Sequence, residues 1–99
     1  MKVIEKYELV NGKYPNHVVL VKSGNFWITY KKDTIICKYV FGYELKNKRI
    51  SFPNNTLNKN LGKLRKLNIS YVLVYELDNI VLVDNTNNSA LQILVGSKK

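Results

Sequence analysis

The chain has a single cysteine, Cys37, and a single histidine, His17, among its 99 residues. One cysteine excludes an intramolecular disulfide, which fits a reducing compartment such as the cytosol. The lone histidine has no cysteine, histidine or carboxylate pair at ligand spacing, so we expect neither a metal nor a cofactor. No apolar run approaches the ~20 residues that span a bilayer, and residues 1–6 lack the apolar stretch of a signal peptide. We therefore expect a cytoplasmic protein that does not engage a membrane.

Catalytic motifs are also missing. There is no Gly-rich phosphate loop of the Walker type, so ATP hydrolysis is not expected. The seven acidic residues are scattered, and only Glu76 and Asp78 are spaced to share a face at a strand end. A carboxylate pair is the minimum for a metal-dependent nuclease, but no nearby lysine pattern accompanies this one. We expect no catalytic residues, and a small nuclease is the least favoured of three hypotheses.

Positive charge and apolar residues are abundant instead. Lys and Arg number 16 against 7 Asp and Glu, a formal net charge of +9, and hydrophobic residues make up 45%. The apolar fraction is that of a folded domain, and the length allows one hydrophobic core, so residues 1–99 are treated as a single domain. The charge favours a polyanionic partner, nucleic acid first. The plainer alternative is a surface that lysine merely solubilises.

Two strands joined by a glycine turn are predicted near the start. Residues 18–22 form a nearly continuous apolar run, typical of a strand covered on both faces. Ser23-Gly24-Asn25 predicts a tight turn, and residues 25–30 then alternate with period two. One face of this second strand carries Phe26, Ile28 and Tyr30, and the other carries Trp27 and Thr29. Residues 1–16 fit either a helix or, because Asn11-Gly12 is a turn signal, a short strand.

The second half of the chain contains one helix between strands. Residues 41–45 and 49–52 are interpreted as two strands joined by a Lys46-Asn47-Lys48 turn. A helix start is indicated at residues 53–56, after which Leu57, Leu61 and Leu64 form an apolar stripe with Lys59, Lys63 and Lys66 on the opposite side. Residues 71–75 and 80–83 predict a hairpin, whereas residues 89–95 fit either a helix or a strand. This order predicts a mixed α/β domain with about five or six strands and two or three helices.

The order of these motifs resembles the N-terminal mismatch-recognition domain (domain I) of MutS, the DNA mismatch-repair protein. The resemblance covers residues 14–84. It is carried by Gly24-Asn25-Phe26-Trp27 with Tyr30 and Asp33 after it, by Ser51-Phe52-Pro53 before the leucine helix, and by the strand 71–76. It implies a MutS-like fold and a short helix over residues 34–40, for which Asp33 or Thr34 is a plausible N-cap.

The resemblance also implies a DNA-reading tip. Phe26 stands where the family has a phenylalanine that wedges beside a mispaired base, and Ile28 stands where it has a glutamate that hydrogen-bonds to that base. Ile28 accepts no hydrogen bond, so specific mismatch recognition by the family mechanism is not expected. If the family geometry holds, Trp27 is buried, and Phe26 and Ile28 form an exposed apolar tip.

The favoured hypothesis is a non-catalytic accessory module that binds nucleic acid, DNA in the first place. Its expected contacts are Phe26, Ile28, Lys31, Lys32, Lys59, Lys63 and Lys66, with the lysines on phosphates and Tyr30, Tyr39 and Tyr43 as further candidates to stack on bases. By analogy it would assist a larger enzyme, such as a reverse transcriptase from a mobile element. The alternative is a protein-interaction module that docks through the Phe26/Ile28 tip on a larger DNA- or RNA-processing enzyme.

Overall fold

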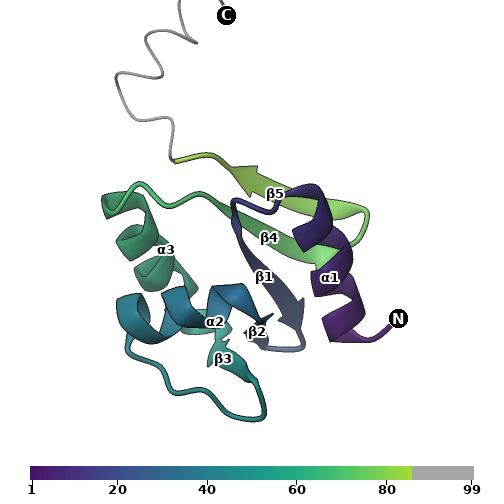
Figure 1. Cartoon of the computed structure of the whole chain (residues 1–99), viewed down its shortest axis with the longest axis horizontal. Helices are drawn as coiled ribbons and strands as arrows, with labels where there is room; N and C mark the ends of the chain where they lie inside the picture. Colours follow the sequence, from purple (N-terminus) through teal and green to yellow (C-terminus); the bar gives the residue numbers. More distant parts are fainter. Residues whose placement is uncertain (86–99) are drawn as a thin grey trace, which may run out of the picture.

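A five-stranded mixed sheet forms the centre of the fold (Figure 1). We describe it from a computed structural model that defines residues 1–85. The strands are β1 (Val18–Ser23), β2 (Phe26–Tyr30), β3 (Arg49–Pro53), β4 (Tyr71–Glu76) and β5 (Asn79–Val83), arranged in the order β3-β2-β1-β4-β5. β1 and β4 are parallel, and the other neighbours are antiparallel. This sheet, with three α-helices among the described residues, confirms the predicted mixed α/β fold.

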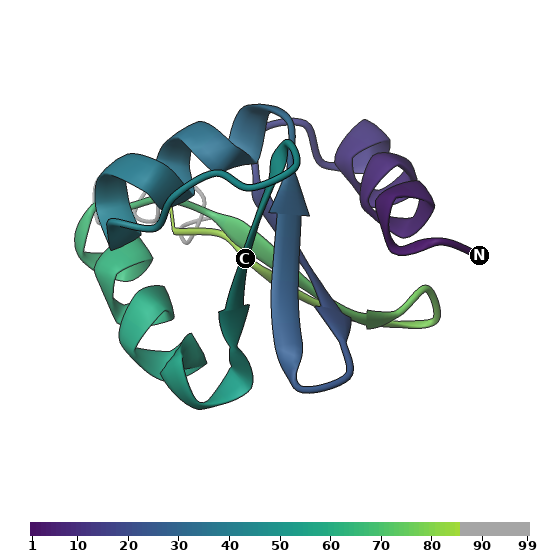
Figure 2. The same ribbon diagram turned by 90° about the horizontal axis from the view of Figure 1, so that it is seen from below.

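Helices cover both faces of the sheet (Figure 2). α1 (Val3–Lys13) lies on one face. α3 (Leu57–Lys66), preceded by the 3-10 turn η2 (Asn54–Thr56), covers the other face together with η1 (Cys37–Phe41), a π-helical segment that continues α2 (Lys32–Ile36). The sheet therefore separates two cores, and alternate side chains of each central strand enter opposite ones.

The central strands β1 and β4 are covered on both faces, as the apolar run at residues 18–22 predicts. The first four residues of each strand are buried. Val18 and Leu20 pack in the core under η1 and α3, whereas Val19 and Val21 pack in the core under α1. The parallel register pairs Val18 with Tyr71.

Residues 3–13 form a helix rather than the alternative short strand. α1 runs through Asn11-Gly12 without ending there. Tyr7 and Val10, three residues apart on one face, are buried against the sheet, and this packing outweighs the local turn signal. The helix ends before Pro15, which disfavours helical geometry at Tyr14.

The helix predicted over residues 34–40 is present, but its start differs from the prediction. α2 begins at Lys32, and neither Asp33 nor Thr34 is the N-cap; that position is Lys31, whose side chain makes no capping hydrogen bond. The Asp33 carboxylate instead accepts from groups of α1 and β1. Gly42, with φ of 80°, ends η1 in the left-handed conformation that glycine adopts readily.

The strand predicted over residues 41–45 does not form. Phe41 is the last residue of η1 and packs edge-on against Phe52 in the core, so residues 42–45 cannot extend a hairpin. The predicted turn is present, with Asn47 and Lys48 both at positive φ and reciprocal backbone hydrogen bonds between Lys46 and Arg49. The second predicted strand corresponds to β3.

The remaining elements agree with the sequence analysis. Leu57, Leu61 and Leu64 of α3 are buried, and β4 and β5 form the predicted hairpin. The ambiguous segment 89–95 lies outside the described residues. Among residues 1–85 no helix combines the length and hydrophobicity needed to cross a membrane.

Candidate nucleic-acid interface

Phe26 is an exposed aromatic side chain at the tip of the β1–β2 hairpin. Gly24, at φ of 59°, makes the turn, and Phe26 opens β2 with 47% of its surface exposed, whereas Trp27 is fully buried. This confirms the predicted orientation of the Phe26–Trp27 pair.

Ile28 does not form a tip with Phe26, and that expectation is wrong. Ile28 is only 8% exposed and packs with Tyr30, Val21 and residues of α1 in the second core. Alternation puts Phe26 and Ile28 on the same face, but α1 covers the middle of β2 and leaves the hairpin turn uncovered (Figure 2). An Ile28 contact with a ligand would require α1 to move, so the exposed apolar tip consists of Phe26 alone.

A shallow groove adjoins Phe26. Asn25, Pro53, Asn54 and Asn55 line this groove, which has a volume of about 310 Å³. Two hydrogen bonds of 2.7 Å, from the Asn54 amide to the Asn25 carbonyl and from the Trp27 indole to Asn54 Oδ1, fasten the hairpin turn to the segment that starts α3. The fold therefore places the hairpin turn beside the segment that leads into α3, while the Phe26 side chain itself points to the sheet face that carries α1.

The outer face of α3 carries unpaired positive charge. Lys59, Lys63 and Lys66 lie opposite the buried leucines, and α3 contains no acidic residue. Within residues 1–85 these three lysines have no ion-pair partner. Residues 37–69 hold eight basic residues and one acidic residue, Glu44, and so carry +7 of the chain's +9. Figure 1 shows α3 and β3 together on one side, away from α1 and the β4–β5 turn.

Lys31 and Lys32 lie elsewhere and already have partners. They follow the far end of β2, about 16 Å along an extended strand from Phe26. Lys31 pairs with Glu8 at 2.5 Å, and Lys32 pairs with Asp33 at 2.7 Å and donates to the His17 carbonyl at 2.8 Å. The structure thus does not bring these two predicted contacts together with Phe26 and α3.

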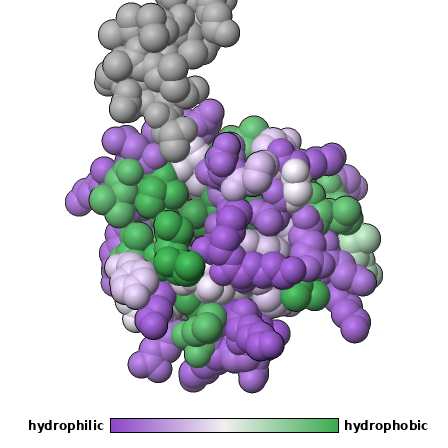
Figure 3. All heavy atoms as spheres, in the orientation of Figure 1, coloured by the Kyte–Doolittle hydropathy of each residue, from purple (hydrophilic) through white to green (hydrophobic). Residues whose placement is uncertain are grey.

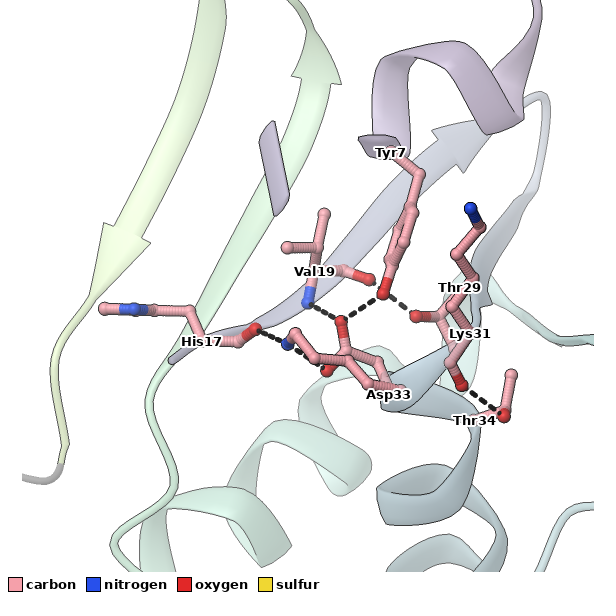
Figure 4. A network of polar contacts seen from close by, with 8 residues as sticks. Tyr7, His17, Val19, Thr29, Lys31, Asp33 and Thr34 are labelled. Atoms are coloured by element: carbon pink, nitrogen blue, oxygen red, sulfur yellow. Dashed lines mark hydrogen bonds and ion pairs between the residues drawn. The ribbon is translucent and has the colours of Figure 1, made fainter. Parts of the chain in front are cut away.

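Asp33 is the centre of a buried polar network (Figure 4). Its Oδ2 atom accepts from the Tyr7 hydroxyl at 2.7 Å and from the Val19 amide at 3.0 Å, and the Thr29 hydroxyl donates to the Val19 carbonyl at 2.7 Å. The β1–β2 ladder begins only at Val21, so side chains satisfy the backbone of Val19 where the ladder does not. Burial, and then the Asp33 carboxylate, raise the pKa of the Tyr7 phenol above its ordinary value. This network joins α1, β1 and α2.

His17 and Cys37 show no arrangement suited to catalysis. Neither buried ring nitrogen of His17 has a hydrogen-bond partner within residues 1–85, and the ring lies edge-on to Tyr14. Cys37 is fully buried, and burial together with the charge of Asp33 raises the pKa of its thiol to about 12. The thiol is therefore protonated at neutral pH and a poor nucleophile.

The tyrosines proposed to stack on bases differ in accessibility. Tyr30 is buried at 7% exposure, whereas Tyr39 is 78% exposed, with the Lys38 ammonium 5.8 Å from its ring centroid. Tyr43 is half-buried and stacks on Phe52.

A groove of about 470 Å³ that sequence analysis did not anticipate lies between residues 42–48 and β3. Its lining is Gly42, Tyr43, Glu44, Lys46, Asn47, Arg49 and Ser51. The one sequence signal for this groove was the predicted Lys46-Asn47-Lys48 turn.

The two carboxylates considered for a nuclease are Glu76 and Asp78. Glu76 forms an ion pair of 3.0 Å with Lys6. No group of three His, Cys, Asp or Glu side chains among residues 1–85 is placed to hold a metal ion.

Comparison of the chain with protein-family models and with curated proteins finds no match. The resemblance to the MutS domain therefore stays a prediction, carried by the residues quoted for it.

Proposed function

We propose that this chain is a non-catalytic accessory module that binds nucleic acid, DNA in the first place. The observation that carries the proposal is the unpaired lysine face of α3, in a segment with a net charge of +7. Lysines that already have a carboxylate partner gain little from a phosphate. Those of α3 have none among the described residues, and so are free to release counterions from a nucleic-acid backbone.

Phe26 supplies the second contact in this proposal. It is exposed beside a groove of about 310 Å³, next to the segment that starts α3. An aromatic ring at that position stacks most easily on a base that is unpaired or weakly stacked. Ile28 is apolar and buried, so the module would bind without specific recognition of mispairs. The resemblance to MutS supports DNA as the partner and, by analogy of fold, a role beside a larger enzyme such as a reverse transcriptase. The single cysteine fits a cytoplasmic location.

The test is a salt-dependent titration with homoduplex DNA, mismatched duplex, single-stranded DNA and RNA. Replacing Lys59 and Lys66 with glutamine should reduce the slope of log K against log salt by about 0.7 to 0.9 per lost phosphate contact. The matched control replaces Lys2 and Lys13, two exposed lysines of the α1 region, and leaves the same net charge. Equal slopes for both variants, or no binding at low salt, would contradict the proposal.

A second candidate is a protein-interaction module that docks through Phe26. The observation in its favour is that a large aromatic side chain is exposed at a hairpin tip beside a groove. Phe26→Ala is compared with Leu9→Ala, a similarly exposed apolar residue on α1. The second candidate predicts that Phe26→Ala abolishes binding to a larger DNA- or RNA-processing enzyme without changing the affinity for any nucleic acid. A selective loss of affinity for single-stranded or distorted DNA supports the first candidate instead.

A further inference from the structure

An apolar patch on the α2–η1 side of the domain is uncovered among residues 1–85. Its members are Ile35, Ile36, Val40, Leu67 and Ile69. Ile35 is 60% exposed and Leu67 is 56% exposed, whereas the other three are half-buried against the core. Ile36 and Ile69 both line a groove of about 240 Å³, so the helical part of the patch adjoins the segment between α3 and β4. Figure 3 shows hydrophobic residues gathered over this region.

The described chain ends beside this patch. The Asn85 side-chain amide donates to the Ile69 carbonyl at 2.8 Å, and the Asn85 backbone amide donates to the Ser70 hydroxyl at the same distance. The chain after β5 is therefore anchored at the patch and continues from there with residues 86–99.

The residues that follow have the composition of a docking segment. Residues 90–95 read Ala-Leu-Gln-Ile-Leu-Val, which is apolar except at Gln92. The six residues from Asn85 to Leu91 reach up to about 20 Å, more than the ~15 Å length of the ten helical residues of α2 and η1. Leu91 and the residues after it can thus reach every part of the patch.

We propose that residues 89–95 pack on the patch of the same chain. A tethered segment has an effective concentration of about a millimolar, so it competes well against a separate partner of similar chemistry. Docking removes from water both the exposed side chains of the patch and the one apolar run beyond residue 85. The fold then has a covered surface on this side and leaves α3's lysine face and Phe26 available.

The experiment uses the full chain and neutral substitutions. Leu91→Ser/Leu94→Ser is compared with Asn87→Ser/Asn88→Ser, a matched pair in the same segment. We expect the leucine variant to lower Tm by about 5 °C and to shift the NMR methyl signals of Ile36, Leu67 and Ile69, and the asparagine variant to do neither. Identical behaviour of the two variants overturns the proposal.

A substitution in the patch tests the same interface without changing residues 89–95. Leu67→Ser changes an exposed residue, so the core stays intact. It should lower Tm in the wild-type background and have little further effect in the leucine variant, because both changes remove one interface. Additive effects overturn the proposal. So does a dependence of the methyl shifts on protein concentration together with a dimer by light scattering, since the occupant is then a second copy.

Discussion

Removing the Asp33 carboxylate is the perturbation whose consequences the structure defines best. Asp33 is 2% exposed, and its Oδ2 atom accepts from the Tyr7 hydroxyl and the Val19 amide, both in fully buried residues. Asp33→Ala leaves both donors without a partner in places that water does not reach. Tyr7→Phe removes one hydrogen bond but leaves Asp33 with Val19 and Lys32.

The expected magnitudes follow from the number of groups left unpaired. A buried donor without a partner costs about 1–3 kcal/mol, so Asp33→Ala, with two of them, should lose about 4 kcal/mol of unfolding free energy. Tyr7→Phe removes a hydrogen bond to a charged group and should lose about 2 kcal/mol. In the Asp33→Ala background, Tyr7→Phe should leave the free energy of unfolding unchanged or raise it, because the Tyr7 hydroxyl no longer has the carboxylate as its acceptor. Tyr7→Phe should therefore partly rescue Asp33→Ala.

The assay is urea denaturation followed by the fluorescence of Trp27, the single, buried tryptophan. Tyr39→Phe, at an exposed position without a hydrogen bond among the described residues, is the matched control and should stay within about 0.5 kcal/mol of wild type. Additive losses in the double variant would refute the reasoning, since they would mean that the two side chains stabilise the fold separately.

Three further predictions concern pH, strain and specificity. Unfolding free energy should fall above pH 9, because the Cys37 thiol ionises near its ordinary pKa of 9.0 when unfolded but only near about 12 when folded. The stabilisation from the neutral thiol is complete below pH 9 and is lost by about 1.4 kcal/mol per pH unit above it. In urea titrations, the unfolding free energy of Cys37→Ala should depend less steeply on pH than that of the wild type. Lys31→Gly should raise Tm, because φ of 52° and ψ of −127° strain a lysine by about 1–3 kcal/mol and glycine loses only about 0.5–1 kcal/mol in entropy; a lower Tm would contradict this. Mismatched duplex should bind less than about tenfold more tightly than matched duplex, a difference of about 1.4 kcal/mol, because Ile28 offers no polar contact. A larger ratio in the dissociation constants would show that another group contacts the mispair.

The local patterns that identified the sheet and α3 rest on contacts close in sequence. Alternation in β2 was enough to predict that Phe26 and Trp27 point to opposite faces, and the spacing of Leu57, Leu61 and Leu64 was enough to predict the buried face of α3. That Trp27 is the buried residue of the pair was implied only by the resemblance to MutS. Both patterns depend only on the period of the element. They do not depend on what packs against it.

The errors arose where a distant element decides the outcome. Ile28 is buried because α1 crosses its face of the sheet, and nothing near residue 28 encodes the position of α1. Residues 41–45 have strand-like composition, but the core needs Phe41 at the end of η1 against Phe52. Asp33 looked like a helix cap because its partners, Tyr7 and Val19, are 26 and 14 residues away.

The structure distinguishes lysines that the net charge of the sequence treats alike. The value of +9 makes no distinction among lysines, yet Lys6, Lys31 and Lys32 each have a carboxylate partner. The carboxylates of the Lys6 and Lys31 pairs are exposed, so these two pairs contribute little to stability, but the pairing still reduces the attraction of the lysines for a phosphate. The lysines of α3 have no carboxylate partner among residues 1–85. Three acidic residues and no basic residue occur in residues 70–85, which lie outside the basic segment 37–69. If this chain binds a polyanion as we propose, the net charge of residues 37–69 directs the polyanion to α3 rather than to the surface around α1, where Glu5, Glu8 and Glu76 offset the lysines.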